Sequence, residues 1–248
     1  MFREASDFNQ PLNDWNVASV TTMNGMFYYA LNFNQSLNDW NVESVTDMKY
    51  MFSSASDFNQ SLNDWDTSRV TAMSKMFYKA STFNQPLNNW NVSRVKSMGY
   101  YIESYSYYGM FQYATNFNQP LDDWNVANVN NMAGMFLEAT NFNQPLDDWN
   151  VTSVNDMAFM FSPAPAFNQP LDDWDVASVT DMQYMFFSAT SFNQPLENWN
   201  VASVTKMNGM FFRASDFNQC LSSWASKTKT DVNVGNIFSS SGCPDKNP

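Results

Sequence analysis

Histidine is absent from this chain of 248 residues, and that absence removes several kinds of chemistry. Without an imidazole there is no Ser-His-Asp triad, no histidine general base and no histidine metal ligand. The sequence also lacks the glycine-rich patterns that hold phosphates and the G-x-S-x-G turn of serine hydrolases. Carboxylates remain, but they recur uniformly, without the different environments that separate a catalytic acid from a nucleophile. We therefore expect a protein that is not an enzyme.

Basic residues are scarce and unevenly placed. The chain has 12 lysines and arginines against 24 acidic residues, and residues 97–205 contain 12 acids but no lysine or arginine. The remaining residues carry 12 acids and 12 bases, so the formal net charge of −12 comes entirely from residues 97–205. Binding to a nucleic acid backbone needs a basic face, so we expect no nucleic acid partner. Cationic ligands or metal ions suit this charge better.

Long apolar runs are also missing. No stretch approaches the ~20 apolar residues of a membrane-spanning helix, so the sequence predicts no transmembrane segment. Residue 1 already lies inside a repeated unit, and no signal peptide precedes it. Our interpretation is that a leader and an N-terminal cap were removed, or that the chain is a fragment of a longer one.

The sequence does contain a strict internal repeat. Successive tryptophans are 25 residues apart, except for one step of 34 residues between Trp90 and Trp124, and Met-Phe pairs repeat the same spacing with the same lapse. A fixed period of this length is typical of a solenoid, in which each unit contacts only its neighbours. We predict a single solenoid of nine 25-residue coils.

Each unit contains two patterned segments. Apolar and polar residues alternate over Phe8–Leu12, which predicts a short extended strand. Over residues 22–30 the apolar residues are spaced by three and four, which predicts a short helix or 3₁₀ turn. We expect the recurring phenylalanines, tryptophans and methionines to fill the core, in preference to an exposed tryptophan row for sugars or a methionine metal site.

An Asn-Gln pair recurs with the apolar positions, beginning at Asn9 and Gln10. Buried amides need hydrogen-bond partners, and stacked copies can supply them for one another. We expect one of the two amides to form a ladder between coils and the other to face outward as a candidate binding row.

The run F-N-Q-P-L-N-D-W-N-V-x-S-V-T-x-M-x-x-M-F recurs over nearly the whole chain and resembles the BspA-like leucine-rich-repeat surface proteins. The closing stretch, residues 217–220 and 236–244, is similar to the terminal repeat of eukaryotic algal and protist members. The resemblance implies a right-handed, leucine-rich-repeat-like solenoid with short parallel strands. It also implies a secreted, extracellular or cell-surface protein with a recognition or adhesive role. It supplies no catalytic or ligand-binding residues, and this chain departs from the pattern by lacking an N-terminal cap and carrying an insertion.

The lapse in the repeat is a nine-residue insertion within residues 97–109. Insertions in solenoids form loops on one face, which is often the binding face. Tyrosine and serine together make an adaptable contact surface. The alternative is a loop that merely shields one coil. The candidate binding residues are its five tyrosines, Tyr100, Tyr101, Tyr105, Tyr107 and Tyr108.

The chain has two cysteines, Cys220 and Cys243. In a protein with surface-protein affinities they suggest one disulfide. We expect it to close a C-terminal cap at residues 220–248, after a repeat solenoid at residues 1–219. Closing that loop is worth about 3 kcal/mol on the loop-entropy account.

The middle units carry an Asp-Asp pair at one repeat position. Copies one coil apart are expected about 5 Å from each other. The favoured interpretation is an acidic rim exposed to solvent. The alternative is a ladder of Ca²⁺ ions, which this spacing suits, and Ca²⁺ is the one cofactor we consider. The residues are Asp122, Asp123, Asp147, Asp148, Asp172 and Asp173.

Four N-x-[ST] sequons are candidate glycosylation sites in a eukaryotic protein. Asn91 and Asn150 follow a tryptophan in an expected loop and are the favoured pair. Asn34 and Asn59 belong to the Asn-Gln row, where packing counts against modification.

These observations favour a non-enzymatic recognition or adhesion solenoid that binds protein or glycan partners. The alternative is a structural subunit that associates through its open ends, head to tail, into an extracellular filament or surface layer.

Overall fold

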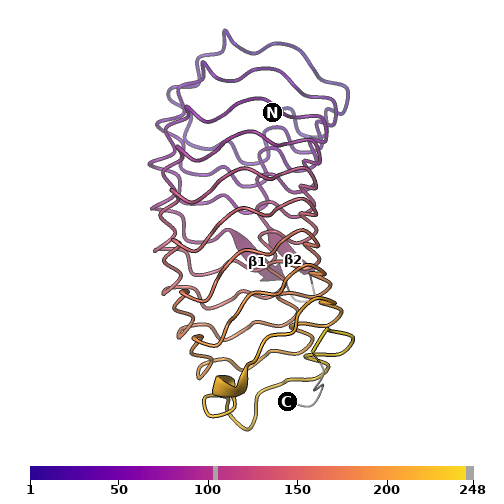
Figure 1. Cartoon of the computed structure of the whole chain (residues 1–248). Helices are drawn as coiled ribbons and strands as arrows, with labels where there is room; N and C mark the ends of the chain where they lie inside the picture. The colour runs from indigo at the N-terminus through magenta and orange to yellow at the C-terminus, as the bar shows by residue number, and fades with distance from the viewer. Residues whose placement is uncertain (103–105, 244–248) are drawn as a thin grey trace.

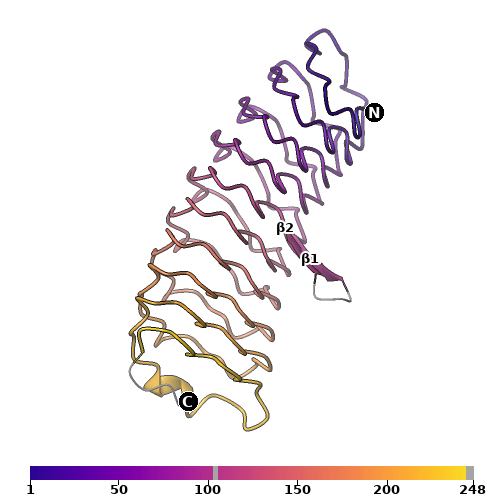
Figure 2. The same cartoon turned by 90° about the vertical axis from the view of Figure 1, so that its right-hand side faces the viewer.

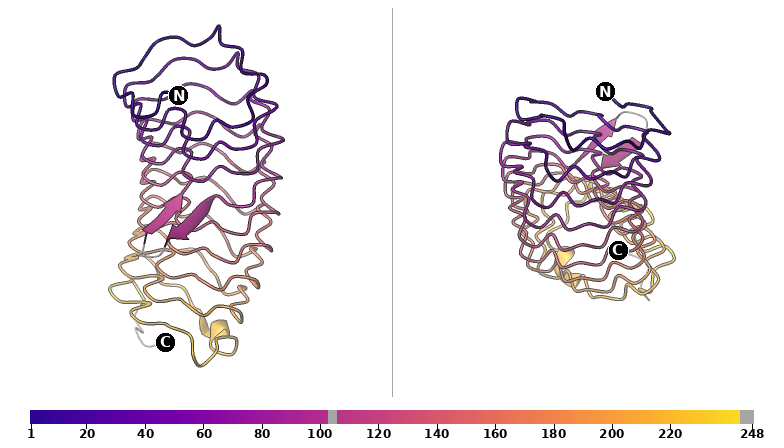
Figure 3. Two further views of the ribbon diagram at one scale, coloured as in Figure 1. Left: turned by 180° about the vertical axis from the view of Figure 1, so that it is seen from behind. Right: turned by 90° about the horizontal axis from the view of Figure 1, so that it is seen from above.

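The repeated units stack as flattened coils into one continuous rod in the computed structural model (Figure 1). The structure describes residues 1–102 and 106–243, without the side chains of residues 101, 102 and 106. The views from behind and from above show that successive coils enclose a single interior (Figure 3). In the part of the chain that is described, no helix has the length and apolar character needed to cross a bilayer.

A backbone ladder joins each coil to the next. It consists of isolated parallel bridges of one residue each, beginning with Thr22 to Asp47 and ending with Lys206 to Asn233. Around the first bridge, Met23 N donates to Asp47 O at 2.9 Å, and Thr46 N donates to Thr21 O at 2.8 Å. This ladder lies outside the segment Phe8–Leu12, so the strand predicted there is wrong.

Side chains replace that strand pairing at the Asn-Gln position. Asn34 Oδ1 accepts hydrogen bonds from Asn59 N at 3.0 Å and Gln60 Nε2 at 2.9 Å. In a parallel sheet this backbone N–H would donate to a carbonyl of the neighbouring coil. Here it donates to the side-chain oxygen of an asparagine instead. The same bonds continue to Asn193, Asn218 and Gln219. Both amides belong to one ladder, rather than to a ladder and a separate binding row.

The helix or 3₁₀ turn predicted over residues 22–30 does not form. Phe27 N donates to Met51 O in the next coil at 2.9 Å, whereas Ala30 N donates within the coil to Phe27 O at 3.1 Å. Gly25 and Tyr29 have φ of +60° and +58°, in the left-handed region that a right-handed helix excludes. The spacing of three and four arises from turns that point Met, Phe and Ala inward. Among the described residues the one helical element is the 3₁₀ turn η1 (Ser222–Trp224).

Parallel rows of aromatic rings fill the interior, as predicted. Phe27 and Phe52 stack at 5.5 Å between ring centroids, and Trp65 and Trp90 at 6.4 Å. Trp40 Nε1 donates to Leu12 O at 3.0 Å, a bond that later tryptophans repeat. From Trp40 onward the tryptophans are buried, so they form no exposed sugar-binding row, and only Trp15 is 40% exposed.

The stacking distances explain the shape of the rod. Rings are closer on the side where the turns hydrogen-bond than on the tryptophan side, so the stack bends toward the turns. Figure 2 shows this gentle bend, with a short hairpin standing out on its inner side.

The C-terminal segment continues the same rows. Trp224 Nε1 donates to Leu196 O, and the Phe238 ring stacks on Phe211 at 5.7 Å. Cys220 and Cys243 form no disulfide in the structure. The exposed Cys220 thiol donates to Ser222 Oγ at 3.3 Å instead, so the predicted pairing stays a prediction.

Candidate functional site

The insertion forms a regular two-stranded hairpin. Strand β1 (Gly99–Ile102) pairs antiparallel with β2 (Ser106–Gly109), with Gly99 opposite Gly109 at the base. Beneath it Met110 N donates to Met98 O at 2.8 Å, the bond that Met26 and Met23 make in an ordinary unit. The coil therefore closes as usual, and the extra residues leave it as a side branch (Figures 1 and 2).

Small residues make room for the hairpin base. A Cβ on Gly99 would lie 1.9 Å from Ala133 O, and one on Gly109 would lie 1.9 Å from Gly134 O. Both positions therefore exclude any side chain. Ala133 and Gly134 lie in the next coil and place no large side chain beneath the hairpin.

One face of the hairpin packs toward the N-terminal coils. The cross-strand neighbours Tyr100 and Tyr108 share this face. The Tyr100 hydroxyl is hydrogen-bonded to that of Tyr50, and the ring of Tyr108 meets that of Tyr78 edge-on at 6.3 Å. Burial, together with the Tyr50 hydrogen bond, raises the pKa of Tyr100. These tyrosines fasten the hairpin to the coils before it.

A lysine lies among the same rings. Lys75 Nζ is 3.1 Å from the ring centroid of Tyr108, 4.7 Å from that of Tyr78 and 5.5 Å from that of Tyr50. Partial burial, reinforced by the charge of Lys79, lowers the pKa of Lys75 to about 8. Cation–π attraction holds the ammonium in place although the site disfavours its charge.

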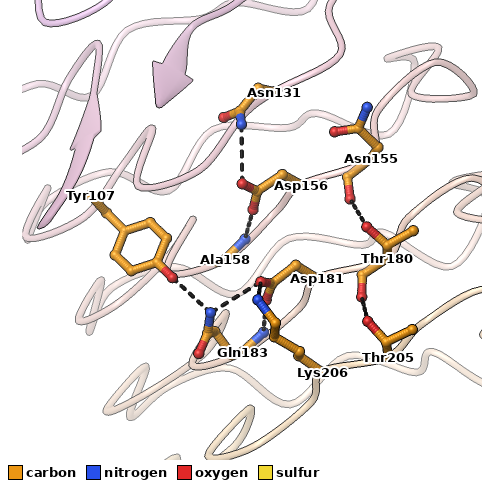
Figure 4. Close-up of polar contacts among 10 residues, drawn as sticks. All are labelled: Tyr107, Asn131, Asn155, Asp156, Ala158, Thr180, Asp181, Gln183, Thr205 and Lys206. Carbon is orange, nitrogen blue, oxygen red and sulfur yellow. Dashed lines mark hydrogen bonds and ion pairs between the residues drawn. The ribbon is translucent and has the colours of Figure 1, made fainter. Parts of the chain in front are cut away.

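The opposite face of the hairpin packs toward the C-terminal coils. Tyr107 is 7% exposed, and its ring centroid is 4.4 Å from that of Phe159. Its hydroxyl accepts a hydrogen bond from Gln183 Nε2 at 2.6 Å, and Gln183 also donates to Asp181 Oδ2 at 3.0 Å. Lys206 Nζ pairs with Asp181 at 2.9 Å (Figure 4). Tyr107 therefore fixes the hairpin against two further units.

Beside the hairpin lies an open groove of about 570 Å³, which residues from both faces of the hairpin line. Its lining is mainly aromatic, with one carboxylate, from Glu138, and no basic residue. Burial raises the pKa of Tyr113, and the nearby charge of Glu138 raises it further. The lining residues are Tyr78, Tyr107, Tyr108, Gln112, Tyr113, Leu137, Glu138, Phe159, Ser162, Pro163, Tyr184 and Phe187.

The structure brings some of the predicted tyrosines together. Tyr107 and Tyr108 line the groove from opposite faces of the hairpin, whereas Tyr100, on the same face as Tyr108, packs against Tyr50 instead. The side chains of Tyr101 and Tyr105 lie outside the described residues. Sequence reasoning missed Phe159, Tyr184 and Phe187, among others. The available signal was their position, since they occupy variable sites beside the Met-Phe pairs where other units carry Gly, Lys or Ser.

The predicted Ca²⁺ residues lie elsewhere on the rod. Asp172 is half-buried and the other five are exposed, and Asp123 and Asp172 accept hydrogen bonds from Asn88 and Asn198. Within the described residues, no group of three or more acidic or cysteine side chains is placed to hold a metal ion. The Ca²⁺ ladder remains a prediction.

The structure distinguishes two kinds of sequon. Asn91 and Asn150 are exposed, and each side-chain oxygen accepts a hydrogen bond from the hydroxyl two residues later, at 2.6 Å and 2.7 Å. Asn34 and Asn59 are half-buried and hold the amide ladder. The two exposed sequons are those favoured from the sequence, and their glycosylation stays a prediction.

Three overlapping stretches, residues 1–108, 105–186 and 148–245, match the family described as Mycoplasma protein of unknown function, DUF285. The chain belongs to this family. The repeated DUF285 matches agree with the resemblance to BspA-like repeats and with a repeat solenoid. Comparison with curated proteins gave no match.

Proposed function

We propose that this DUF285 solenoid is a non-enzymatic recognition or adhesion module, located at the cell surface or outside the cell. In this proposal the groove beside the hairpin binds a protein or glycan partner. The single observation that carries it is the hairpin, which converts one stretch of a uniform rod into a hollow lined by aromatic side chains. Concave, mostly apolar sites with a few polar groups are where proteins usually bind ligands.

The way the hairpin is held supports a role beyond shielding one coil. Gly99 and Gly109 leave no room for a side chain at its base, and Tyr107 is anchored through Phe159 and Gln183. These contacts spread over several units and hold one wall of the groove. A rigid wall lowers the entropy cost of binding.

The finer features of the fold belong to the same proposal. They are a right-handed, leucine-rich-repeat-like coil, nine units, and an affinity with algal and protist members. The DUF285 match and the stacked coils are compatible with them.

The test is a binding screen of the whole chain on immobilised glycans and extracellular proteins. Phe187→Ala removes a groove ring, and Tyr28→Ala removes the ring at the same repeat position outside the groove. We expect Phe187→Ala to weaken binding at least tenfold and Tyr28→Ala to leave it within twofold. Full binding by Phe187→Ala to every partner would reject the groove as the site.

The alternative function is that of a subunit that assembles head to tail. Measuring the oligomeric state distinguishes it from recognition. Sedimentation over a wide range of concentrations should show one monomeric species if recognition is the function. Growth of long assemblies as concentration rises would favour the filament.

A further inference from the structure

Aromatic rings on the inner face of the rod fall into two groups. Rings in and near the N-terminal coils have a cation of this chain beside them. The Arg3 guanidinium lies 4.5 Å from the Tyr28 ring centroid, and Lys75 Nζ lies 3.1 Å from that of Tyr108. Lys79 Nζ lies between Tyr78 and Tyr113, at 5.4 Å and 5.5 Å. This surface therefore accepts ammonium and guanidinium groups.

The second group begins on the C-terminal side of the hairpin. The Phe159 and Tyr184 rings are 4.9 Å apart, and the Tyr184 and Phe187 rings are 5.9 Å apart, edge to face. All three are half-buried in the groove, and none has a cation of the described chain over it. The sequence explains why, since residues 97–205 contain no lysine or arginine. Phe159 already lies against both Tyr107 and Tyr184, at 4.4 Å and 4.9 Å, so Phe187 is the ring left to receive a cation. Arg213 lies over Phe212 at 5.2 Å, one unit beyond Phe187.

Lys75 and Lys79 lie over the groove rings Tyr78, Tyr108 and Tyr113. Charge therefore favours a cation from elsewhere only at the other, C-terminal end of the groove. Glu138 lines the same hollow, and the surrounding units carry the excess of acidic residues. A cation over an aromatic face gains about 0.5–1 kcal/mol when exposed and about 2 kcal/mol when partly desolvated. An acidic surface also attracts positive partners over longer distances.

The length of the groove suits a peptide segment. Its lining residues come from five consecutive units, and stacked phenylalanines of these units are 5.6–5.7 Å apart. The groove is thus on the order of 20 Å long, enough for about six residues of an extended chain at ~3.3 Å each.

We infer that the groove binds a lysine- or arginine-bearing segment of a partner protein, with one cationic side chain over Phe187 and another paired with Glu138. This inference rests on the proposed function, because it names the partner class of the same site. The chain's own Lys75 and Lys79 show the contact that the partner repeats.

The experiment measures fluorescence anisotropy of a labelled peptide that alternates lysine and serine, against the same peptide with glutamine in place of lysine. The intact chain should bind the lysine peptide at least tenfold more tightly. Glu138→Gln should weaken that binding severalfold and lower its salt dependence. Asp147→Asn is the matched control, since it removes one exposed acid of the same charged region outside the groove, and it should stay within twofold.

A second pair of variants separates ring chemistry from folding. Phe187→Leu keeps apolar bulk but removes the π face, so affinity should fall severalfold while the melting temperature changes little. Unchanged binding by both Phe187→Leu and Glu138→Gln overturns the inference, because attraction to the net charge then suffices. If the lysine peptide fails to bind while the screen still finds a groove-dependent neutral partner, the inference is wrong and the proposed function stands. If no binding depends on the groove, both are wrong.

Discussion

At the scale of the residue, one asparagine connects three coils. Asn143 N donates to Asn118 Oδ1 at 2.9 Å, and Asn143 Oδ1 accepts from Asn168 N at 2.9 Å and Gln169 Nε2 at 3.0 Å. The recurrence of Asn and Gln predicted a ladder, but not that the glutamine would reach back to the asparagine of the preceding unit. That choice depends on the distance between coils, which a single unit does not reveal.

Replacing Asn143 tests this ladder. Asn143→Ala leaves the partly buried backbone N–H of Asn168 without its acceptor and removes one of the two acceptors of Gln169 Nε2. The cost should be about 1–3 kcal/mol in the free energy of unfolding. Asn143→Asp keeps an oxygen acceptor for both donors and should cost less. Urea unfolding at neutral pH measures both variants. Equal losses for alanine and aspartate would show that acceptance by Oδ1 is not what stabilises the coils.

Lys75 carries a prediction on pH. Its pKa of about 8 lies below the ordinary 10.5, mainly because of burial, so between these values the folded chain binds fewer protons than the unfolded chain. The contribution of Lys75 to stability is therefore present above pH 10.5 and is lost as the pH falls through about 8. An NMR titration of the Lys75 side chain should show a midpoint near pH 8, and Lys79→Gln should raise it. A midpoint at the ordinary value in the wild-type chain would contradict the burial seen in the structure.

At the scale of the element, the sequence predicted the inward-facing residues of the turn segment and the position of the hairpin, but the hydrogen bonds of neither. The spacing of apolar residues correctly predicted which side chains of residues 22–30 face inward, but it could not tell hydrogen bonds within a coil from bonds between coils. The alternate N–H groups go to the next coil, which requires left-handed φ at Gly25 and Tyr29 and excludes a helix. The insertion was visible as an interruption of the repeat, whereas the contacts that anchor its hairpin come from coils on either side of it.

Deleting Tyr101–Gly109 tests whether the hairpin is a removable branch. The deletion restores the 25-residue period and places Tyr100 where Tyr50 stands in its own unit. Because Met110 already bonds to Met98 as in a regular unit, we expect a folded rod that has lost the groove wall. Its melting temperature should stay within a few degrees of the wild-type value, and groove-dependent binding should disappear. Unfolding of this variant would show that the hairpin is structural.

At the scale of the whole molecule, stability is shared between neighbouring coils. Each unit contacts the units before and after it, so the rod has no central core on which all coils depend. The phenylalanine and tryptophan rows pass through the full length, and their unequal spacing produces the bend, on whose inner side the hairpin stands (Figure 2). The groove exists because this stack supports both of its walls.

Phe136→Ala tests this dependence on neighbours. Phe136 is fully buried between Phe111 and Phe161, each 5.7 Å away, so the cavity should cost about 3–5 kcal/mol locally. Interrupting the row in the middle should also uncouple the two halves of the rod. Hydrogen exchange should then show one half opening before the other. Phe2→Ala is the control. It removes a half-buried ring at the end of the same row, where Phe27 is its one neighbour in that row, and all coils should still open in a single transition. Uniform opening of the Phe136→Ala rod would contradict nearest-neighbour stabilisation.

The sequence by itself determined the repeat, its period, the buried aromatic and methionine rows and the place of the insertion, because these follow from the chemistry of one unit copied along the chain. It also located the region without basic residues. Only the tertiary structure decided which backbone groups bond across coils, that Tyr107 is buried while Tyr184 and Phe187 line a groove, and that the acidic pairs lie away from it. These outcomes depend on side chains brought together from different units, whose proximity is set by the spacing and curvature of the stack.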